Sequence, residues 1–450
     1  MTRTLPYTLF LLALLISACY KEVDRPLTVD FTYVLADSSH TVPASVNFTN
    51  RSAGATGFKW TFEGGEPGVS GYENPGTVTF QQAGNYKITL EAWNDDTRQT
   101  KTLEIHLDSA VTVAFDADIQ VNDFSPVAVK FTNRTVGAST CKWTFEDATP
   151  ATANGPAPPV VTFTTPGPHN VTLQVSNGGQ QFSLSKTITV KPPLHTAFDI
   201  TPSFQDDDLE APLTAILKST SSSYLIQKWQ ASGGGVLASD TASNTTVYFR
   251  DPGTYTITLT TGNNKDNQTI TKTITVKPNT RLRTLTDVKL GISTAHADIG
   301  CFYSTRLRRA FKKGDDLTSA GKEIDLVFFG LNRSFTYNKF VSPDSAASYT
   351  FPTIPGATAT RFINKQEQCN CSLSPFTAAD FDNMLNDAPL QNLQLPAGAT
   401  GGIQFNSDVL PRIVLFQTAD GRKGAVKIKD YVLEGSTAYI LADIKIQKYE

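Results

Sequence analysis

The sequence contains few of the residues on which most metal sites and many active sites depend. Among 450 residues there are five histidines and five cysteines. No histidine stands in a His-Glu-x-x-His pattern or a comparable ligand pair, which excludes the common zinc motifs. The Gly-x-Ser-x-Gly elbow of the α/β-hydrolases is missing as well. We therefore expect no metal and no cofactor, and we expect the protein not to be an enzyme.

The chain also lacks an excess of charge of either sign. It has 39 Lys and Arg residues against 42 Asp and Glu residues, which gives a net charge of -3. Proteins that bind nucleic acids neutralise many phosphates with Lys and Arg, so we expect no nucleic-acid partner. The length allows about two to four domains, each large enough to bury a core of its own.

A single long apolar run occurs, and it lies at the N-terminus. Arg3 precedes the run from Leu9 to Ile16, which is too short to span a bilayer as a helix and ends in "LISAC". Leu-x-x-Cys with small residues before the cysteine resembles the bacterial lipobox. The resemblance implies that residues 1–18 are a signal peptide and that Cys19 becomes the lipidated first residue, which anchors the protein to a membrane.

Residues 19–26 follow as a tether and include "YKEVDRP". Lys21, Glu22 and Asp24 resemble the Lys-acidic tether of Bacteroidota lipoproteins that are exported to the cell surface. This resemblance implies an outer-membrane protein, lipid-anchored and facing outward. Val23 interrupts the acidic pair, and an ordinary solvated linker explains the same residues, so the periplasmic face stays open.

Most of the chain is an internal triple repeat. Shifts of 83 and then 86 residues bring identical residues into register without a gap between the tryptophan and the end of each repeat. The aligned sets are Trp60, Trp143 and Trp229; Phe80, Phe163 and Phe249; Gly84, Gly167 and Gly253; Leu90, Leu173 and Leu259; Asn94, Asn177 and Asn263; and Ile105, Ile188 and Ile274.

Each repeat alternates apolar and polar residues, as in "YKITLEA", "HNVTLQV" and "TYTITLT". This period of two predicts half-buried antiparallel strands, and the spacing of Gly and Pro predicts about seven of them per repeat. The fold class is therefore mainly β, with three tandem immunoglobulin-like sandwiches at 27–108, 109–192 and 193–278. Pro192, Pro193 and Pro278 would stiffen the joints between them.

The first repeat resembles the PKD (polycystic-kidney-disease) domain, an immunoglobulin-like sandwich. The resemblance rests on "WTFEGG" and "NPGTVTFQQAGNYKITLEAWN". It extends over residues 27–278, although the second repeat has His169 where the family has tyrosine, and the third has Gln230 and Ala231 in the phenylalanine segment. The family's Gly-Asp-Gly turn is replaced in all three repeats. The resemblance implies extracellular spacer or interaction modules and no catalysis.

The tryptophans differ in the face on which they lie. Trp60 shares a face with Phe58 and Phe62, so we expect it and its two repeats to point into the core. Trp93 follows the buried series that ends at Ala92 and therefore faces outward, where the other repeats have Ser176 and Gly262. Trp93 is our candidate contact for a sugar, a neighbouring domain or a protein partner. A ring that simply packs on its own sheet is the alternative.

Two acidic clusters invite a comparison with calcium sites. "QDDDLE" at 205–210 and the pair Asp95 and Asp96 lie on expected loops, but neither has the spacing of an EF-hand. We interpret both as solvated acidic loops.

Residues 281–450 form a further β-rich domain with a short helix. "RIVLFQTADGRKGAVKIKDYVLEGSTAYILADIKIQKY" predicts three strands with a tight turn at Asp420 and Gly421, and one lysine-rich outer face around Lys427 and Lys429. "EIDLVFFGL" predicts another strand, and "SPFTAADFDNMLND" a helix that begins near Ser374 or Thr377. The region is loosely similar to the terminal domains of many Bacteroidota surface lipoproteins, a class without a common activity.

Two constellations in this domain bear on chemistry. His296, Asp298 and Cys301 are the residue types of a thiol nucleophile with its base, but neighbours in one extended stretch cannot all face one point. After lipidation of Cys19, a disulfide between Cys301 and Cys369 or Cys371 is the pairing that we favour. The basic run "RLRRAFKK" at 306–313 suits either an anionic ligand or a charged strand edge.

The sequence thus predicts a non-catalytic surface lipoprotein whose sandwiches present the C-terminal domain for binding or adhesion to a glycan or protein. Glycan capture for a polysaccharide importer, a structural role in the envelope and, more remotely, an unrecognised hydrolase are the alternatives.

Overall fold

The computed structural model describes residues 26–449 except 37, 39, 178–179, 367–375 and 435–436. The predicted signal peptide, the lipidation site Cys19, almost all of the tether, and Cys369 and Cys371 lie outside the described residues. Among the residues that are described, no helix is both long and apolar enough to cross a membrane.

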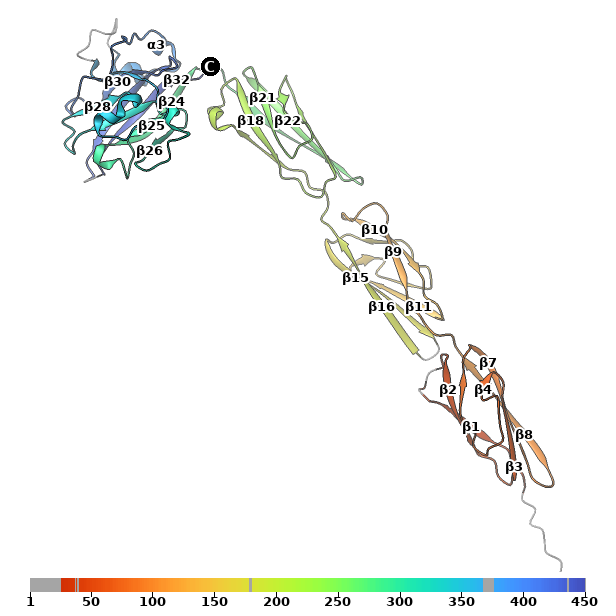
Figure 1. Cartoon of the computed structure of the whole chain (residues 1–450). Helices are drawn as coiled ribbons and strands as arrows, with labels where there is room; N and C mark the ends of the chain where they lie inside the picture. The colour runs from red at the N-terminus through yellow and green to blue at the C-terminus, as the bar shows by residue number, and fades with distance from the viewer. Residues whose placement is uncertain are drawn as a thin grey trace, which may run out of the picture. The chain divides into compact units, whose positions relative to one another are not determined.

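The first repeat folds as a β-sandwich (Figure 1). Its described strands form two antiparallel sheets with the orders β1-β2-β6-β4 and β5-β3-β7-β8. The alternating residues that face inward close one core between the sheets, as the period of two predicted. The strands are β1 (Phe31–Leu35), β2 (Ala44–Asn50), β3 (Gly57–Phe62), β4 (Gly65–Glu66), β5 (Val69–Ser70), β6 (Gly76–Phe80), β7 (Gly84–Trp93) and β8 (Arg98–Leu107).

The second repeat has the same topology. Its described strands pair in the orders β12-β14-β10-β9 and β13-β11-β15-β16, around a separate core. The strands are β9 (Phe115–Ile119), β10 (Val127–Asn133), β11 (Thr140–Phe145), β12 (Ala148–Thr149), β13 (Thr152–Asn154), β14 (Val161–Phe163), β15 (Gly167–Asn177) and β16 (Gln180–Val190).

The third repeat also folds as a sandwich, with the sheet orders β17-β18-β21-β20 and β19-β22-β23 in the described residues and its own core. Its elements are β17 (Phe198–Pro202), the 3-10 helix η1 (Phe204–Asp206), β18 (Leu213–Ser219), β19 (Ile226–Ala231), β20 (Val236–Leu237), β21 (Asn244–Phe249), β22 (Gly253–Gly262) and β23 (Asn267–Val276). The predicted mainly β class with immunoglobulin-like sandwiches is confirmed.

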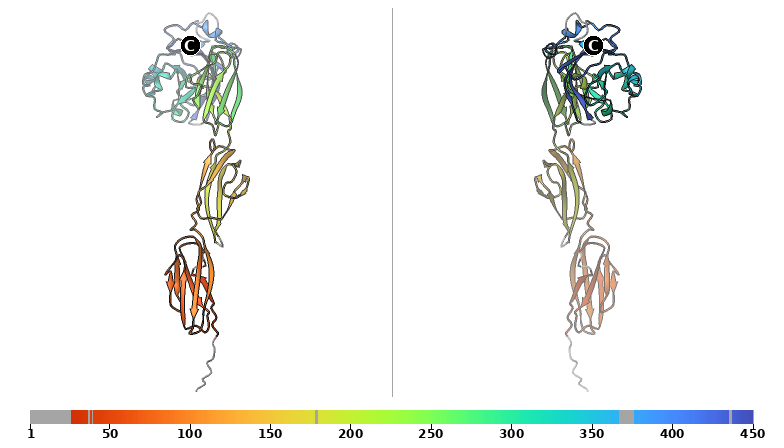
Figure 2. Two further views of the ribbon diagram at one scale, coloured as in Figure 1. Left: turned by 90° about the vertical axis from the view of Figure 1, so that its right-hand side faces the viewer. Right: turned by 90° about the vertical axis from the view of Figure 1, so that its left-hand side faces the viewer.

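The described strands of the C-terminal region form two antiparallel sheets, with the orders β24-β32-β31-β30-β29 and β26-β25-β27-β28. Figure 2 shows the chain from two further sides, with this region in cyan to blue. Its strands are β24 (Leu282–Gly291), β25 (Phe302–Ser304), β26 (Arg309–Phe311), β27 (Leu326–Gly330), β28 (Asn338–Val341), β29 (Arg361–Ile363), β30 (Arg412–Gln417), β31 (Lys423–Val432) and β32 (Tyr439–Gln447). Its helices are η2 (Ser293–Ala295), η3 (Gly321–Glu323), η4 (Pro343–Tyr349), α2 (Ala378–Asp382) and α3 (Ala388–Gln391).

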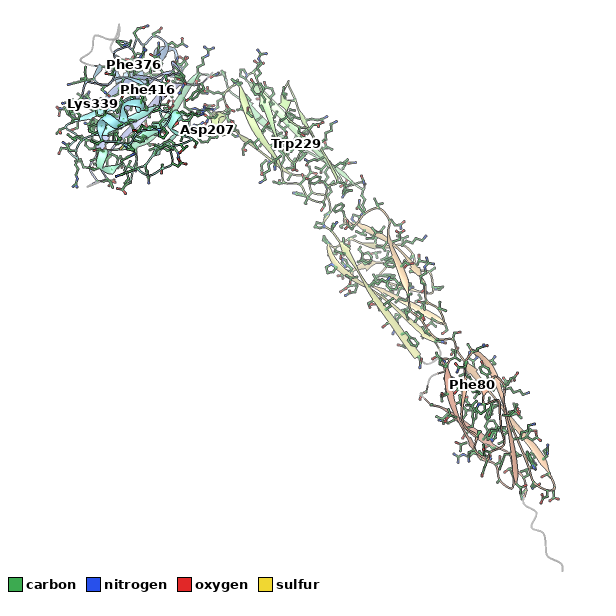
Figure 3. All side chains as sticks on the ribbon, in the orientation of Figure 1. Phe80, Asp207, Trp229, Lys339, Phe376 and Phe416 are labelled. Atoms are coloured by element: carbon green, nitrogen blue, oxygen red, sulfur yellow. The ribbon has the colours of Figure 1, made fainter. Side chains whose placement is uncertain are left out.

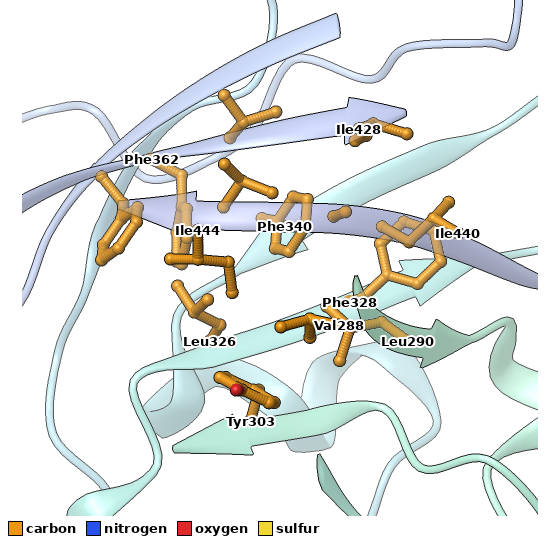
Figure 4. Close-up of a cluster of buried hydrophobic side chains, with 14 of the residues drawn as sticks. Val288, Leu290, Tyr303, Leu326, Phe328, Phe340, Phe362, Ile428, Ile440 and Ile444 are labelled. Atoms are coloured by element: carbon orange, nitrogen blue, oxygen red, sulfur yellow. The ribbon is translucent and has the colours of Figure 1, made fainter. Parts of the chain in front are cut away.

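The two sheets pack face to face over one large core. Val288, Phe328 and Ile444 come from different strands and meet there (Figure 4). A second core covers the outer face of β27, which explains why "LVFFG" is apolar at every position rather than at alternate ones. The three predicted C-terminal strands are confirmed as β30, β31 and β32.

The helix prediction is confirmed at Thr377. Its hydroxyl accepts a hydrogen bond from the N–H of Asp380, and the Asp380 side chain accepts one from the N–H of Thr377, so the two form a capping box at the start of α2. Ser374 lies outside the described residues.

The predicted lysine-rich outer face of β31 is wrong. The segment around α2 and α3 packs on that face of the sheet through Phe376, Phe381 and Leu390. The Lys427 ammonium pairs with Asp382 of α2 at 2.6 Å, and Lys445 of β32 donates to the carbonyl of Phe381. Alternation along β31 predicted two different faces, but the residues that cover the second face come from a distant segment.

Candidate functional site

The three repeated tryptophans belong to the core. Trp60, Trp143 and Trp229 are 0%, 0% and 1% exposed (Figure 3 labels Trp229). Each indole N–H donates to a backbone carbonyl of its own sandwich, that of Tyr72, Gly155 or Ala242, at 2.8–3.1 Å. A fully buried ring with its polar atom satisfied has nothing left to offer a ligand. The core interpretation of these residues is confirmed.

An aromatic residue two positions after the glycine that recurs in all three repeats also has a structural role. Tyr86 and Tyr255 donate their hydroxyl hydrogens to the carbonyls of the residues four positions earlier. His169 replaces tyrosine in the second sandwich and makes the same bond, because its Nε2 lies 2.7 Å from the carbonyl of Thr165. The imidazole therefore takes the place of the phenol in this corner.

Trp93 faces outward, as its position in β7 predicted, but its ring is occupied by its own sheet. It stands directly opposite Gly57, and a Cβ on that glycine would lie 2.4 Å from the indole. The guanidinium of Arg98 covers the ring at 4.9 Å from its centroid, and Arg98 also pairs with Glu91. This arrangement matches the alternative interpretation, in which the Trp93 ring packs on its own sheet.

The other sandwiches explain why Trp93 has no counterpart. Thr140 and Ser176 occupy the same cross-strand pair in the second sandwich and share a hydrogen bond between their hydroxyls. In the third, a Cβ on Gly262 would lie 3.2 Å from the side chain of Ile226. Each cross-strand pair thus combines a large side chain with a glycine or combines two side chains of intermediate size. In the first sandwich, Trp93 fills the space that Gly57 leaves.

The acidic loop at 205–210 makes ion pairs with basic residues of the C-terminal region. Residues Ala197–Thr220 and Thr269–Glu450 belong to one compact unit. Asp207 (labelled in Figure 3) pairs with Arg283 at 2.6 Å and also with Arg308. Lys448 pairs with Asp208 at 2.7 Å and with Glu210 at 2.6 Å. The interpretation of this loop as merely solvated is wrong for these three carboxylates, because their partners are distant in sequence.

These contacts shift the pKa of the Asp207 carboxyl. Burial would raise the pKa of its carboxyl, but the hydrogen bonds from Arg283 and Arg308 outweigh burial and hold the pKa below its usual range. The other acidic pair has a local role: Asp95 and Asp96 lie in the turn between β7 and β8, where Asn94 accepts from the N–H of Asp96. Within the described residues, no group of three His, Cys, Asp or Glu is placed to hold a metal ion.

His296 and Cys301 meet, but not as a base and a nucleophile. The backbone N–H of Cys301 donates to Nδ1 of His296 at 3.1 Å, whereas the thiol points to the carbonyl of Gly291 at 3.2 Å. Burial raises the pKa of the Cys301 thiol far above its usual range. Asp298 is exposed. A buried neutral thiol directed at a carbonyl is not activated for attack.

The two described cysteines, Cys301 and Cys141, lie in different surroundings. Cys301 carries a free thiol in the structure, and its predicted partners lie outside the described residues, so the disulfide stays a prediction. Cys141 is half-buried against the core of the second sandwich and contacts the side-chain amide of Asn133 at 3.3 Å. It behaves as a small apolar residue.

A cavity of about 300 Å³ lies beside His296. The basic run at 306–313 ends there with Lys312 and Lys313, after β26, which is an edge strand of its sheet. The loop that follows contributes Asp315 and Asp316, and a segment about 40 residues further on contributes Pro352 and neighbours. From the sequence, His296 with Asp298 and Cys301 was not expected to act in catalysis, and no pattern in the sequence joined His296 to this loop.

Imidazole, ammonium and carboxylate groups at one cavity offer both hydrogen-bond donors and acceptors. Such a set can hold a polar ligand, and its groups come from segments that are distant in the sequence. It is our candidate functional site.

Comparison with protein families bears on the first sandwich. The family model of the PKD domain matches residues 16–107. Residues 16–107 thus contain a PKD domain. Trp60, which carried the resemblance together with Tyr86, is a core residue of this PKD domain, and Tyr86 packs against that core. The second and third sandwiches repeat its topology, and their assignment to the same family stays a prediction.

Comparison with solved structures finds chains of immunoglobulin-like domains. The I-band fragment I67–I69 from titin is 11% identical, with a TM-score of 0.32, and the match covers 56% of this chain and 98% of that one. Chicken CNTN1 FN1–FN3 domains are 12% identical, with a TM-score of 0.21 and coverages of 54% and 97%. The eight N-terminal Ig domains of Down Syndrome Cell Adhesion Molecule are 10% identical, with a TM-score of 0.24 and coverages of 60% and 38%. The search among curated proteins finds no match.

Proposed function

We propose that the protein is a non-catalytic outer-membrane lipoprotein of the Bacteroidota surface type. Its lipid anchor at Cys19 holds a series of PKD-like sandwiches, and these present the C-terminal region for binding or adhesion outside the cell. The lipobox, the tether and the PKD match at residues 16–107 support this assignment.

One observation supports a spacer role for the sandwiches and a recognition role for the C-terminal region. The three sandwiches share the same buried tryptophan and the same corner hydrogen bond, so the residues that recur are those that fold the domain. The C-terminal region has a different architecture, with a central sheet covered on both faces and a polar cavity. Repeated modules with a constant interior suit a spacer, and the one region that differs suits recognition.

The anchor and the location have a direct test. Metabolic labelling with palmitate should mark the wild-type protein and should fail for Cys19→Ala. Protease added to intact cells should then degrade the wild-type protein if it faces outward. Labelling that persists in Cys19→Ala would contradict the anchor, and full protection in intact cells with digestion after lysis would place the protein on the periplasmic face.

The place of recognition is tested by truncation. A chain that ends at residue 278 keeps three sandwiches, each with its own core, and should lose retention on cells, envelope extracts and polysaccharides. Retention equal to that of the full chain would move recognition into the sandwiches.

Glycan capture is the second candidate function, and the cavity beside His296 favours it. Binding of soluble oligosaccharides would support capture, whereas recovery of an envelope protein without any glycan affinity would support a structural role instead.

A further inference from the structure

The third sandwich lacks an aromatic ring that the other two share. Phe62 of β3 and Phe145 of β11 are 2% and 1% exposed. Each stacks on the tryptophan two positions earlier, with ring centroids 5.8 and 6.0 Å apart. The shift of 86 residues puts Ala231, the last residue of β19, in this position. The third sandwich is therefore equivalent to one in which a buried phenylalanine has been reduced to alanine.

A second ring is missing from the same core. Phe48 and Phe131 contact the repeated tryptophan and phenylalanine in the first two sandwiches, with centroids 5.0–6.1 Å apart. Leu217 takes this position in the third. Among the described residues, Phe198 supplies the one ring contact found for Trp229 (labelled in Figure 3). A core that exchanges large side chains for small ones keeps space wherever its neighbours do not close in.

A cavity of about 470 Å³ lies beside Ala231, within the range of about 300–1,000 Å³ that is usual for ligand pockets. Ala231, Gly235 and Leu237 line it and are half-buried, so a ligand can reach them from solvent. Trp229 is closed off below them, with 1% of its surface exposed. The other lining residues are Gln230, Ser232, Thr256 and Thr258.

This lining favours a neutral ligand that is partly apolar. It contains no charged residue, so neither an anion nor a cation gains an ion pair here. The alanine, glycine and leucine offer carbon surface, and the hydroxyls and the amide can bond to peptide N–H and C=O groups. The sister sandwiches show which side chain suits the position, because both place a phenylalanine ring there.

The strand beside the cavity is also less covered than its counterparts. β3 pairs with β5 and β11 pairs with β13 on the side away from the sheet centre. In the described part of the third sandwich the sheet order is β19-β22-β23, which leaves β19 at the edge. The N–H of Trp229 still donates to the carbonyl of Asp240 at 2.7 Å, but no described strand pairs with Ala231 on that side. An extended peptide fits such an edge.

We propose that this cavity binds an extended peptide segment of a protein partner, with an aromatic side chain of the peptide packed on Ala231 and Leu237 and its backbone beside the end of β19. The site lies in the third sandwich and goes beyond the proposed recognition by the C-terminal region. One buried ring strengthens binding only about 10–100-fold. The contact alone is therefore too weak to retain a truncated chain on cells, and the truncation test above keeps its meaning.

Saturation-transfer NMR on the chain without residues 1–19 tests the site with the capped peptide Thr-Thr-Phe-Thr-Thr and with the same peptide carrying alanine in place of phenylalanine. The phenylalanine peptide should bind at least tenfold more tightly. Ala231→Phe refills the cavity with the ring of the sister sandwiches and should weaken binding at least tenfold. Ala151→Phe adds the same ring at an exposed position of the second sandwich and, as the matched control, should bind as the wild type does.

A photo-crosslinking experiment on the wild-type sequence needs no variant. A peptide with 4-benzoylphenylalanine in place of phenylalanine should form adducts within residues 230–237 or 256–258, located by mass spectrometry. If Ala231→Phe does not fold, the two peptides and the adducts decide. Equal affinity of the two peptides, wild-type affinity in folded Ala231→Phe, or adducts only outside these residues would each overturn the proposal.

Discussion

At the scale of single residues, the sandwiches vary in matched pairs. In the first sandwich the ring of Tyr86 lies over Gly64, where a Cβ would come within 2.4 Å of it. Tyr255 lies over Gly233 in the third. The second sandwich has Asp147 in that position, with a φ of 53°, and the smaller His169 beside it. The smaller ring leaves the space that a Cβ requires.

This pairing predicts coupled effects of mutation. His169→Tyr alone should destabilise the second sandwich by about 1–3 kcal/mol, because the larger ring meets the Cβ of Asp147. Asp147→Gly should remove that penalty, and it should also relieve a left-handed backbone position that suits glycine. Urea unfolding of both single variants and the double variant would give a coupling of about 1–3 kcal/mol. Additive effects would contradict the pairing.

A second pair concerns Trp93. Gly57→Thr should displace the indole and cost about 1–3 kcal/mol, whereas Gly57→Thr with Trp93→Ser reproduces the Thr140–Ser176 pair and should recover most of that loss. Thermal unfolding followed by circular dichroism measures both.

Trp93→Ala should leave retention on polysaccharides unchanged, because the indole packs on its own sheet. A loss of retention would restore Trp93 as a ligand contact.

The lowered pKa of His296 predicts that the folded protein loses stability in acid. The pKa of His296 is about 4 in the folded state, below the ordinary value of about 6.5 for histidine, so the unfolded chain binds more protons between these two pH values. The stabilisation is complete above about pH 6.5 and is lost as the pH falls towards 4, by up to about 3 kcal/mol. Denaturant unfolding at several pH values should show this slope for the wild type and a flatter one for His296→Asn; equal slopes would exclude His296 as the source.

At the scale of elements, the loop around η1 acquires its role from strands that follow much later. Asp207 contacts Arg283 of β24 and Arg308 before β26, and Phe204 lies under the Arg308 guanidinium at 4.3 Å from its ring centroid. The loop therefore binds basic residues of the C-terminal region.

Asp207→Asn should loosen this loop. Because the pKa of Asp207 is lowered in the folded state, its contribution is present above the ordinary value of about 4 and is lost as the pH falls through the folded value. Hydrogen exchange at neutral pH should be faster in residues 204–210 and 306–309 of the variant than of the wild type, while Asp95→Asn serves as a control. Unchanged exchange would show that the ion pairs contribute little.

At the scale of the whole molecule, the described cores are separate. The clusters around Trp60, Trp143 and Trp229 share no residue with one another or with the cores of the C-terminal region. Each sandwich thus has the buried surface that it needs to fold on its own.

Independent cores predict local damage. Trp143→Ala should cost about 3–5 kcal/mol within the second sandwich. Hydrogen exchange should increase throughout residues 115–190 and remain unchanged around Trp60 and in the C-terminal sheets. Faster exchange across the whole chain would indicate that the domains fold as one cooperative unit.

The sequence alone determined the features that are periodic or local. The shifts of 83 and 86 residues, the inward face of Trp60 and the cap at Thr377 depend on neighbours within one strand or one turn, so the pattern contains the necessary information. The strands and sandwiches could be predicted for that reason.

Contacts between distant segments were decided by the tertiary structure. The register of β3 and β7 places Gly57 under Trp93, and the fold brings Asp207 to Arg283, Lys427 to Asp382, and Lys313 to the cavity beside His296. A polar side chain has the same local pattern whether it meets water, an opposite charge or a ligand. What it meets depends on which distant segment packs beside it, and no periodicity in the sequence records that.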